Sequence, residues 1–403
     1  MRNFYYISNG RMFFFENGKE IQIHSEVFDS YIYKLKDDAA RNEWKHSGKG
    51  AEFIGSYDMQ ASAEERVSSV RSNIFGIQKY GEQLFYSISI DGVTGIYRKS
   101  PDSDKEGIVI SSSDIAYRDF DIKGDRMVYT CEFAGERHIA VLDIDTPYSR
   151  TYTEGRTVDS RPVWSKTSDA VYFVSSGLLL DDGQDEPRGD NRSFAQATAE
   201  MLTNTGDPDA CERSPEVICR LDFESGSISE ILADEKYDFT SPQATEKGEL
   251  YYIKRPHKTE SASSFLGCLC DIVLFPFRML SALFGFFNLF SAKYSGKTLS
   301  KSGNAKHKNE QQTVIDGNLI NAKKELEQNR KSGDRSPGFI PKTWELRRIS
   351  PSGEDSLVRK GVCAYRVNSD GSILVSNGSY VIEIDENGKE KDVHKAHRVT
   401  FIR

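Results

Sequence analysis

Cysteine is scarce in this sequence, and its positions follow no disulfide pattern. The 403 residues contain six cysteines without the spacing of a small disulfide-rich fold: Cys131, Cys211, Cys219, Cys268, Cys270 and Cys363. The N-terminal run MRNFYYISNGRMFFF contains no unbroken apolar stretch and no small-residue cleavage site, so no secretory signal peptide is predicted. We therefore expect free thiols in a reducing, cytoplasmic compartment.

The chain also lacks the short motifs that mark catalytic and metal sites. No two glycines lie four residues apart, which excludes the G-x-S-x-G turn of many hydrolases. The run Gly296-Lys-Thr298 looks like the end of a phosphate loop, but Ser291 stands where that loop needs glycine. His394 and His397 have no evident third ligand, and the acidic run 181–186 lacks the spacing of a calcium loop. The sequence therefore predicts no catalytic residue, no metal and no cofactor.

The chain as a whole has no excess of basic charge. The net charge is −8, whereas residues 254–340 hold 14 Lys/Arg against 7 Asp/Glu and so carry +7. The rest of the chain therefore carries −15, which argues against nucleic acid as a partner. A basic segment on an acidic body predicts a local contact with an anionic surface or molecule.

Short β-rich runs separated by turns are abundant. The composition includes 23 Phe and 19 Tyr, which favour strands over helices. Runs that begin at Leu84, Met127 and Val171 lie 43 and 44 residues apart, about the length of a four-stranded propeller blade. Each follows a turn rich in Gly, Asp, Ser or Asn. Counting the second strand of each blade gives six blades, beginning near Phe4, Leu84, Met127, Val171, Leu250 and Ile373.

The two ends of the sequence share a pattern. Residues 6–20 read YISNGRMFFFENGKE and residues 374–390 read LVSNGSYVIEIDENGKE, so S-N-G and E-N-G-K-E mark the same two turns. The N-terminal run supplies three strands of a blade, and His397–Ile402 supplies the missing one. We predict an all-β fold over residues 1–403. It is a six-bladed β-propeller of four-stranded blades, closed by N- and C-terminal strands, with a helical hydrophobic insert in the fifth blade.

One blade carries a recognisable signature. The stretch Ser160-Arg-Pro-Val-Trp-Ser-Lys-Thr-Ser-Asp-Ala-Val-Tyr-Phe-Val-Ser175 resembles the P-x-W-S-x-D repeat of TolB-type propellers, which is also found in the propeller of prolyl oligopeptidases. Residues 239–243 match it in part. The resemblance implies the fold and says little about activity, and the chain has no room for an α/β-hydrolase domain.

Three segments exceed a minimal blade. Residues 26–47 place Phe28, Tyr31, Ile32 and Leu35 at helical spacing, which predicts an amphipathic helix between the first two blades. Residues 181–212 form a polar, acidic insert. Residues 259–341 interrupt the fifth blade, with an apolar helical segment at 264–290 and a basic, flexible and helical segment at 291–340. Apolar residues from Val314 to Leu326 favour one short helix there.

The apolar segment has the length of a membrane span but the wrong topology for one. A single crossing would separate the two ends that a closed propeller must pair. Pro276 divides the run and Asp271 and Arg278 interrupt it, so we expect a monotopic anchor that enters and leaves one leaflet. The residues predicted to insert are Phe265, Leu266, Leu269, Ile272, Val273, Leu274, Phe275, Phe277, Leu280, Leu283, Phe284, Phe286, Phe287, Leu289 and Phe290.

Basic residues flank this run on both sides, as expected where a segment meets anionic lipid. The predicted lipid contacts are Lys254, Arg255, Lys258, Lys293, Lys297 and Lys301. Two other interpretations stay open: the run packs against a protein partner or a second subunit, or it packs within the chain's own core.

Several polar and aromatic residues lie on or beside the predicted innermost strands, where alternate side chains face the channel. They are Tyr117, Arg118, Asp121, Arg161, Trp164, Tyr365 and Arg366. The leading hypothesis is a non-catalytic binding or scaffold propeller, with an unidentified protein partner, that associates peripherally with a membrane. The alternative is a lyase or hydrolase whose channel-mouth site is assembled from several blades.

Overall fold

The chain folds into six four-stranded antiparallel sheets. The computed structural model describes residues 2–42, 67, 70, 72–100, 105–146, 148–177, 214–257, 312–315 and 317–403. Blade one contains β26 (Val399–Ile402), β1 (Phe4–Ser8), β2 (Arg11–Glu16) and β3 (Lys19–Ile23). Blade two contains β4 (Ser72–Tyr80), β5 (Gln83–Ile90), β6 (Val93–Lys99) and β7 (Glu106–Ser112). Blade three contains β8 (Ala116–Lys123), β9 (Arg126–Phe133), β10 (Glu136–Asp143) and β11 (Ser149–Thr151).

The remaining blades repeat the same order. Blade four contains β12 (Ser160–Trp164), β13 (Ala170–Ser175), β14 (Val217–Asp222) and β15 (Ile228–Leu232). Blade five contains β16 (Tyr237–Ala244), β17 (Leu250–Pro256), β20 (Glu345–Ile349) and β21 (Asp355–Lys360). Blade six contains β22 (Ala364–Val367), β23 (Ile373–Ser376), β24 (Val381–Ile384) and β25 (Glu390–His394). The second strands begin at or within one residue of the six predicted positions, which confirms the blade count.

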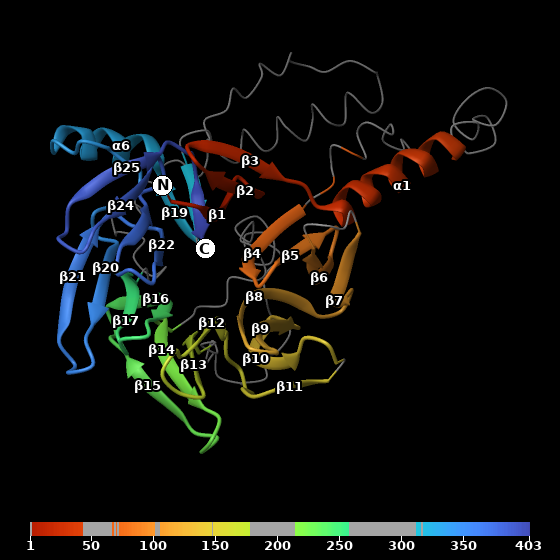
Figure 1. Ribbon diagram of the computed structural model, residues 1–403, viewed down its shortest axis with the longest axis horizontal. Coiled ribbons are helices and arrows are strands. Elements are labelled where there is room, and N and C mark those ends of the chain that lie inside the picture. The colour runs from red at the N-terminus through yellow and green to blue at the C-terminus, as the bar shows by residue number, and fades with distance from the viewer. Residues whose placement is uncertain are drawn as a thin grey trace, which may run out of the picture. The chain divides into compact units, whose positions relative to one another are not determined.

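The six sheets form a ring. Figure 1 shows them following one another from the red strands of blade one to the blue strands of blade six. The first strands of successive blades contact one another, from β4 through β8, β12, β16 and β22 to β26, and β1 contacts β4. A buried apolar cluster lies between each pair of neighbouring blades, including blades six and one. This arrangement confirms the predicted six-bladed propeller.

The ring closes by pairing the two ends of the chain, as predicted. β26 pairs antiparallel with β1, with Tyr6 opposite Ile402 and Ile7 opposite Phe401. Backbone hydrogen bonds of 2.8 Å run both ways between Tyr5 and Arg403. Because β1 is paired on both sides, the closing blade presents no open edge there.

The shared S-N-G and E-N-G-K-E runs do form hairpin turns. Asn9 and Gly10 connect β1 to β2 with φ of 49° and 71°, and Asn17 and Gly18 connect β2 to β3 with φ of 51° and 80°. Asparagine and glycine adopt this left-handed conformation at the lowest cost, and it matches the twist of a tight hairpin. The turn residues therefore fix the register of blade one.

The helix α1 (Glu26–Asn42) follows blade one and lies within the range 26–47. Ser25 caps its N-terminus, since the Phe28 backbone N–H donates to Ser25 Oγ at 3.2 Å. Phe28 and Tyr31 pack on the apolar cluster shared by blades one and two, with Ile77 and Ile88. Ile32 and Leu35 are half-buried.

The insert in blade five is a unit of its own, residues 258–323, between β17 and β20. Its described part is a hairpin of β18 (Gln312–Ile315) and β19 (Asn318–Asn321), and α6 (Ala322–Lys331) follows. The helix expected from Val314 to Leu326 therefore begins only at Ala322. Gly317, with φ of 72°, makes a turn there, and Val314 is exposed while Ile315 is buried, which is the alternation of a strand. The predicted inserts at 181–212 and 264–290 lie outside the described residues.

Candidate binding site at the channel mouth

A cavity of 630 Å³ opens where the innermost strands turn into the second strands of their blades. We call it the mouth cavity. Five of the six blades contribute to its wall. It is lined by Asn3, Tyr5, Phe14, Glu16, Gln78, Lys79, Gly81, Val163, Lys166, Gln243, Ala244, Arg366, Val367 and Arg403. Four of these side chains are cationic and one is anionic, so the cavity carries positive charge in an otherwise acidic body.

Arg366 is the unusual member of this wall. It lies on β22 and is half-buried, and its side chain makes no hydrogen bond or ion pair with any residue that the structure describes. Burial lowers the pKa of Arg366 below its ordinary value, and repulsion from Arg403 and Arg2 lowers it further. A partly desolvated guanidinium beside two others, with no counter-ion, is unfavourable unless an anion joins it.

Arg403, in contrast, is neutralised. It forms an ion pair with the buried carboxylate of Asp121 on β8, and it donates to Gln78 Oε1 at 3.2 Å. Asp121 also accepts hydrogen bonds from the backbone N–H of Trp164 at 2.8 Å and of Ile122 at 3.0 Å. The carboxylate therefore ties blades one, three and four together beneath the mouth cavity.

Gln243 holds blade six in register with blade five. Its Nε2 donates to the Tyr365 carbonyl at 2.7 Å, and its Oε1 accepts from the Val367 N–H at 3.0 Å. These bonds are on both sides of Arg366 in the chain and fix the backbone that presents it. The amide of Gln243 has thus a positioning role at the site.

The innermost strands of blades four and five share a bulge below the mouth cavity. Arg161 and Ser241 both have positive φ, 53° and 55°, and each precedes a proline. The strand register shifts at both places. Arg161 also donates to Thr240 Oγ1 at 3.0 Å, across the two bulges. The partial sequence match of residues 239–243 therefore corresponds to a shared backbone feature.

One wall of the mouth cavity is aromatic. Tyr5 and Phe14 stack across β1 and β2 with ring centroids 4.5 Å apart, and both line the cavity. Glu16 lies beside them and accepts a hydrogen bond from Asn3 Nδ2 at 3.0 Å. The site thus offers a flat apolar surface as well as positive charge.

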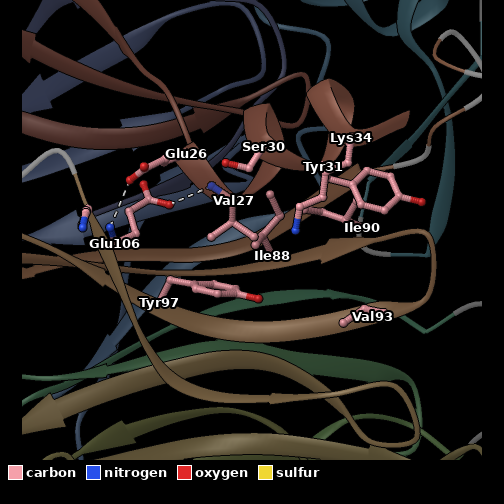
Figure 2. Close-up of a pocket in the computed structure, with 11 residues that line it drawn as sticks. Glu26, Val27, Ser30, Tyr31, Lys34, Ile88, Ile90, Val93, Tyr97 and Glu106 are labelled. Carbon is pink, nitrogen blue, oxygen red and sulfur yellow. Dashed lines mark hydrogen bonds between the residues drawn. The ribbon is translucent and has the colours of Figure 1, made fainter. Parts of the chain in front are cut away.

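A second pocket of 490 Å³ lies between α1 and blade two. Figure 2 shows Ile88 and Tyr97 lining it and Glu26 facing Glu106 across its end. Glu106 accepts from the Val27 N–H at 3.1 Å, and its own N–H donates to Glu26 at 3.1 Å. The buried carboxylate of Glu106 caps the N-terminus of α1. We therefore interpret this pocket as part of the packing interface between α1 and blade two, and not as a ligand site.

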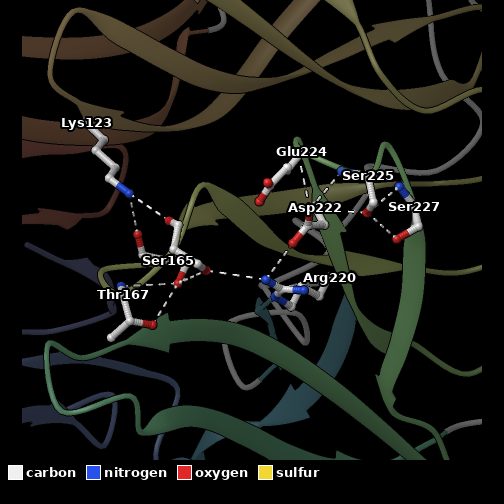
Figure 3. Close-up of polar contacts among 9 residues, drawn as sticks. Lys123, Ser165, Thr167, Arg220, Asp222, Glu224, Ser225 and Ser227 are labelled. Carbon is white, nitrogen blue, oxygen red and sulfur yellow. Dashed lines mark hydrogen bonds and ion pairs between the residues drawn. The ribbon is translucent and has the colours of Figure 1, made fainter.

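The turns of blade four are stabilised by polar contacts among their own residues and with Lys123 of blade three (Figure 3). Lys123 Nζ donates to the carbonyls of Ser165 and Ser168 at 2.9 and 2.8 Å, which joins blades three and four. Asp222 pairs with Arg220 at 2.8 Å and accepts from the Ser225 N–H at 3.1 Å. That backbone hydrogen bond lowers the pKa of Asp222. These groups satisfy one another, so the cluster has a structural role.

The residues predicted to face the channel separate into two groups. Trp164 and Tyr117 are buried in the clusters between blades, and Arg118 pairs with Glu132 at 2.6 Å and lies over the Phe75 ring. Arg366 lines the mouth cavity, and Asp121 supports it from below. The sequence does not indicate Tyr5, Phe14, Gln243 or Arg403, because the wall combines side chains from five blades and no local motif marks them.

The prediction that Arg255 contacts anionic lipid is wrong for this fold. Arg255 is 2% exposed and pairs with Glu216 at 3.0 Å and with Asp238 at 3.4 Å, beneath the Trp344 ring. The ammonium of Lys254 lies 3.9 Å from the centroid of the Tyr237 ring. Lys258, Lys293, Lys297 and Lys301 and the predicted inserting residues 265–290 lie outside the described residues.

Two features are absent from the part of the chain that the structure describes. There, no group of three or more His, Cys, Asp and Glu side chains is arranged to hold a metal ion. Within the same ranges, no helix is both long and apolar enough to span a membrane.

No family model and no curated protein matches this chain. Among solved structures, TolB from Acinetobacter baumannii is 8% identical with a TM-score of 0.47, over 99% of this chain and 66% of that one. A chain of a nidogen–laminin complex is 8% identical with a TM-score of 0.44, over 99% and 97%. The Pyrococcus horikoshii acylaminoacyl peptidase is 11% identical with a TM-score of 0.40, over 80% and 39%.

These likenesses concern fold alone. Their identities are low and their TM-scores lie below 0.5, so they say nothing about activity or partners. This chain spans just under two thirds of the TolB protein's length. The propeller assignment rests on the strand order and the closed ring of contacts. At the level of fold, the chain resembles TolB and other β-propeller proteins.

Proposed function

We propose that this chain is a non-catalytic binding propeller whose partner docks at the mouth cavity. The observation that carries the proposal is the convergence of five blades on one open cavity. That cavity contains a guanidinium, Arg366, that has no anionic partner among the residues that the structure describes. Binding sites are commonly concave, largely preformed and equipped with a few oriented polar groups. Here Gln243 and Asp121 fix the surrounding backbone, so the site is rigid before a partner arrives.

We further propose that the apolar segment 265–290 recruits the propeller to a membrane surface without crossing it. The strand order supports this topology. Residues on both sides of the segment pair in one blade, since β17 precedes it and β20 follows it, and β26 then closes the ring on β1. A single crossing would put these strands on opposite sides of the bilayer.

Vesicle co-sedimentation tests the recruitment. The full chain is compared with a variant that lacks residues 262–309, on zwitterionic vesicles with and without phosphatidylserine. We expect the full chain to pellet with the vesicles, more strongly on the anionic ones, and the deletion variant to stay in the supernatant with an unchanged Tm. Equal pelleting of the two proteins would contradict the proposal.

An enzyme with a site at the mouth cavity is the second candidate, because the wall is open and polar. Among the described residues of that wall, Glu16 is the one carboxylate, so it would act as the general acid or base. A lyase or hydrolase activity that Glu16→Gln abolishes would favour the enzyme over the binding module.

A further inference from the structure

The mouth cavity contains a cation without an anion. Arg366 has no charged or hydrogen-bonding partner among the described residues, although the chain has an acidic body and forms many arginine–carboxylate pairs elsewhere. Arg403 lines the same cavity but already has Asp121. The guanidinium of Arg366 is therefore available to pair with a ligand.

We propose that the mouth cavity binds a carboxylate attached to an apolar or aromatic body, through Arg366. This inference rests on the proposed binding function and names the class of ligand. A carboxylate accepts two parallel N–H bonds from a guanidinium and carries a single charge. That charge equals the one that Arg366 leaves uncompensated.

A phosphate fits this wall less well. It carries nearly two charges and needs further donors. Lys79, a neighbouring cation, lies 3.6 Å from Glu82, and Glu16 would repel a second negative charge. Lys166, the remaining cation of the wall, is exposed to solvent. Among the described residues of the wall, Arg366 is therefore the partly buried cation that has no anion, and its single charge matches a monoanion.

The rest of the wall indicates what the carboxylate is attached to. The stacked rings of Tyr5 and Phe14 and the side chains of Val163 and Val367 line the same cavity. Flat aromatic and branched aliphatic surfaces favour an apolar body over a sugar or a nucleotide ribose. A free organic acid and an acidic residue beside an aromatic one in a peptide both have this chemistry.

Isothermal titration of the full chain separates these sources. The probes are 3-phenylpropionate, a short capped peptide with one aspartate beside a phenylalanine, and inorganic phosphate. The neutral amide of 3-phenylpropionate is the control for apolar contact alone. We expect at least one carboxylate probe to bind and the amide not to bind. Tighter binding of phosphate than of both carboxylates would overturn the assignment.

Substitutions at Arg366 test whether the guanidinium carries the binding. Arg366→Gln removes the charge and should raise Kd by at least about tenfold. Arg366→Lys keeps the charge but loses the planar fork, so its Kd should lie between the Kd of wild type and the Kd of Arg366→Gln. Arg156→Gln is the matched control, because Arg156 is exposed and lies outside the mouth cavity. It should leave Kd within about twofold.

Two further outcomes would overturn the inference. One is that the folded wild-type chain, with a cooperative thermal transition, binds neither carboxylate probe. The other is that Arg366→Gln, folded by the same criterion, binds as tightly as wild type. Vesicle co-sedimentation is independent of Arg366. A chain that pellets with vesicles but binds no carboxylate would therefore refute the ligand class and leave the membrane proposal standing.

Discussion

Asp121 and Arg366 show two ways in which a charge is placed inside a propeller. Asp121 is 1% exposed and has three partners, two backbone N–H groups and the Arg403 guanidinium. Arg366 is half-buried and has none among the described residues. The first arrangement stabilises the ring, and the second leaves an unfavourable charge where a ligand can relieve it.

The substitution Asp121→Ala should destabilise the protein by about 2–4 kcal/mol, because it leaves Arg403 and two buried N–H groups without their acceptor. Urea unfolding followed by fluorescence measures the change. Asp125→Ala is the control, since Asp125 lies exposed on the β8–β9 turn, and it should change stability by less than about 0.5 kcal/mol. An equal effect of the two substitutions would show that the Asp121 network adds nothing.

Arg366→Met should behave in the opposite way. It removes a charge that burial and two neighbouring guanidiniums disfavour, so we expect Tm to stay the same or to rise. Differential scanning calorimetry without ligand gives the comparison. A clear fall in Tm would mean that Arg366 stabilises the free protein and is not held ready for an anion.

At the scale of elements, turns decide much of the local order. Asp370 caps the turn between β22 and β23, and its hydrogen bond from Ser372 Oγ and its pairing with Arg2 lower its pKa to about 2. A depressed pKa adds stability above the unfolded value of 3.8, and that contribution is lost as pH falls from about 4 to about 2. Because Asp370 is largely exposed, the effect is small.

A pH series of thermal melts tests this. The Tm difference between wild type and Asp370→Asn should be present at pH 6 and should shrink as pH falls below about 4. Glu246→Gln is the control, because Glu246 is exposed and has no such partner among the described residues. A difference that is constant from pH 6 to pH 2 would contradict the sign of the shift.

The segment that follows α6 and contains Gly338 packs closely against blade six. A Cβ at Gly338 would lie 2.1 Å from the Asn377 carbonyl oxygen. Asn329 of α6 donates to the carbonyls of Gly338 and Ile340, at 2.8 and 3.1 Å, which holds that segment in place. The helix and the return of the chain to blade five are therefore one packed element.

Gly338→Ala should cost about 2 kcal/mol or more, because the backbone must shift to relieve the overlap. Gly353→Ala is the comparison. Its Cβ would meet nothing within 4 Å, and only its φ of 85° opposes the change, so about 1 kcal/mol is expected. Chemical denaturation of both variants compares the two losses of unfolding free energy. A larger loss for Gly353→Ala would show that the segment around Gly338 shifts easily to make room for the added methyl group.

The elements differ in how far the sequence predicts them. The sequence predicts the hairpins with Asn-Gly or Lys-Gly-Asp turns at the positions where the structure has them, because turn chemistry and the alternation of side chains are local. The sequence predicts a helix from Val314 to Leu326, but apolar residues spaced i, i+1, i+5 and i+6 fit a helix and a tight hairpin equally well. The turn at Gly317 decides for the hairpin.

At the scale of the molecule, the ring is closed by β26. Deleting residues 397–403 removes the buried side chains of Val399 and Ile402 and exposes the edge of β1. We expect loss of the cooperative thermal transition and association of the protein in size-exclusion chromatography with light scattering. The control is Thr400→Ala, which changes an exposed residue of the same strand. This variant should keep the cooperative transition and the elution position of the wild type.

The sequence predicts the closure but only part of the site that the closure completes. Arg366 was identified from its place on an innermost strand, a local property. Tyr5 and Arg403 are 398 residues apart in the sequence and join one wall only after β1 and β26 pair. The matched turns at the two ends predict that these strands pair, but they do not say which side chains line a common cavity. Arg255 was misassigned because its neighbours in sequence are basic, whereas its partners Glu216 and Asp238 come from elsewhere in the fold.

Because β26 is the last strand of the ring to be synthesised, the ring can close only once β26 has been translated. At about 5–20 residues per second, β26 leaves the ribosome roughly 20–80 s after β1. During that interval blades two to six can form in order, while β1 keeps one edge without its partner strand. Slow synthesis of the last hundred residues should therefore lower the yield of folded protein more than slow synthesis of the first hundred.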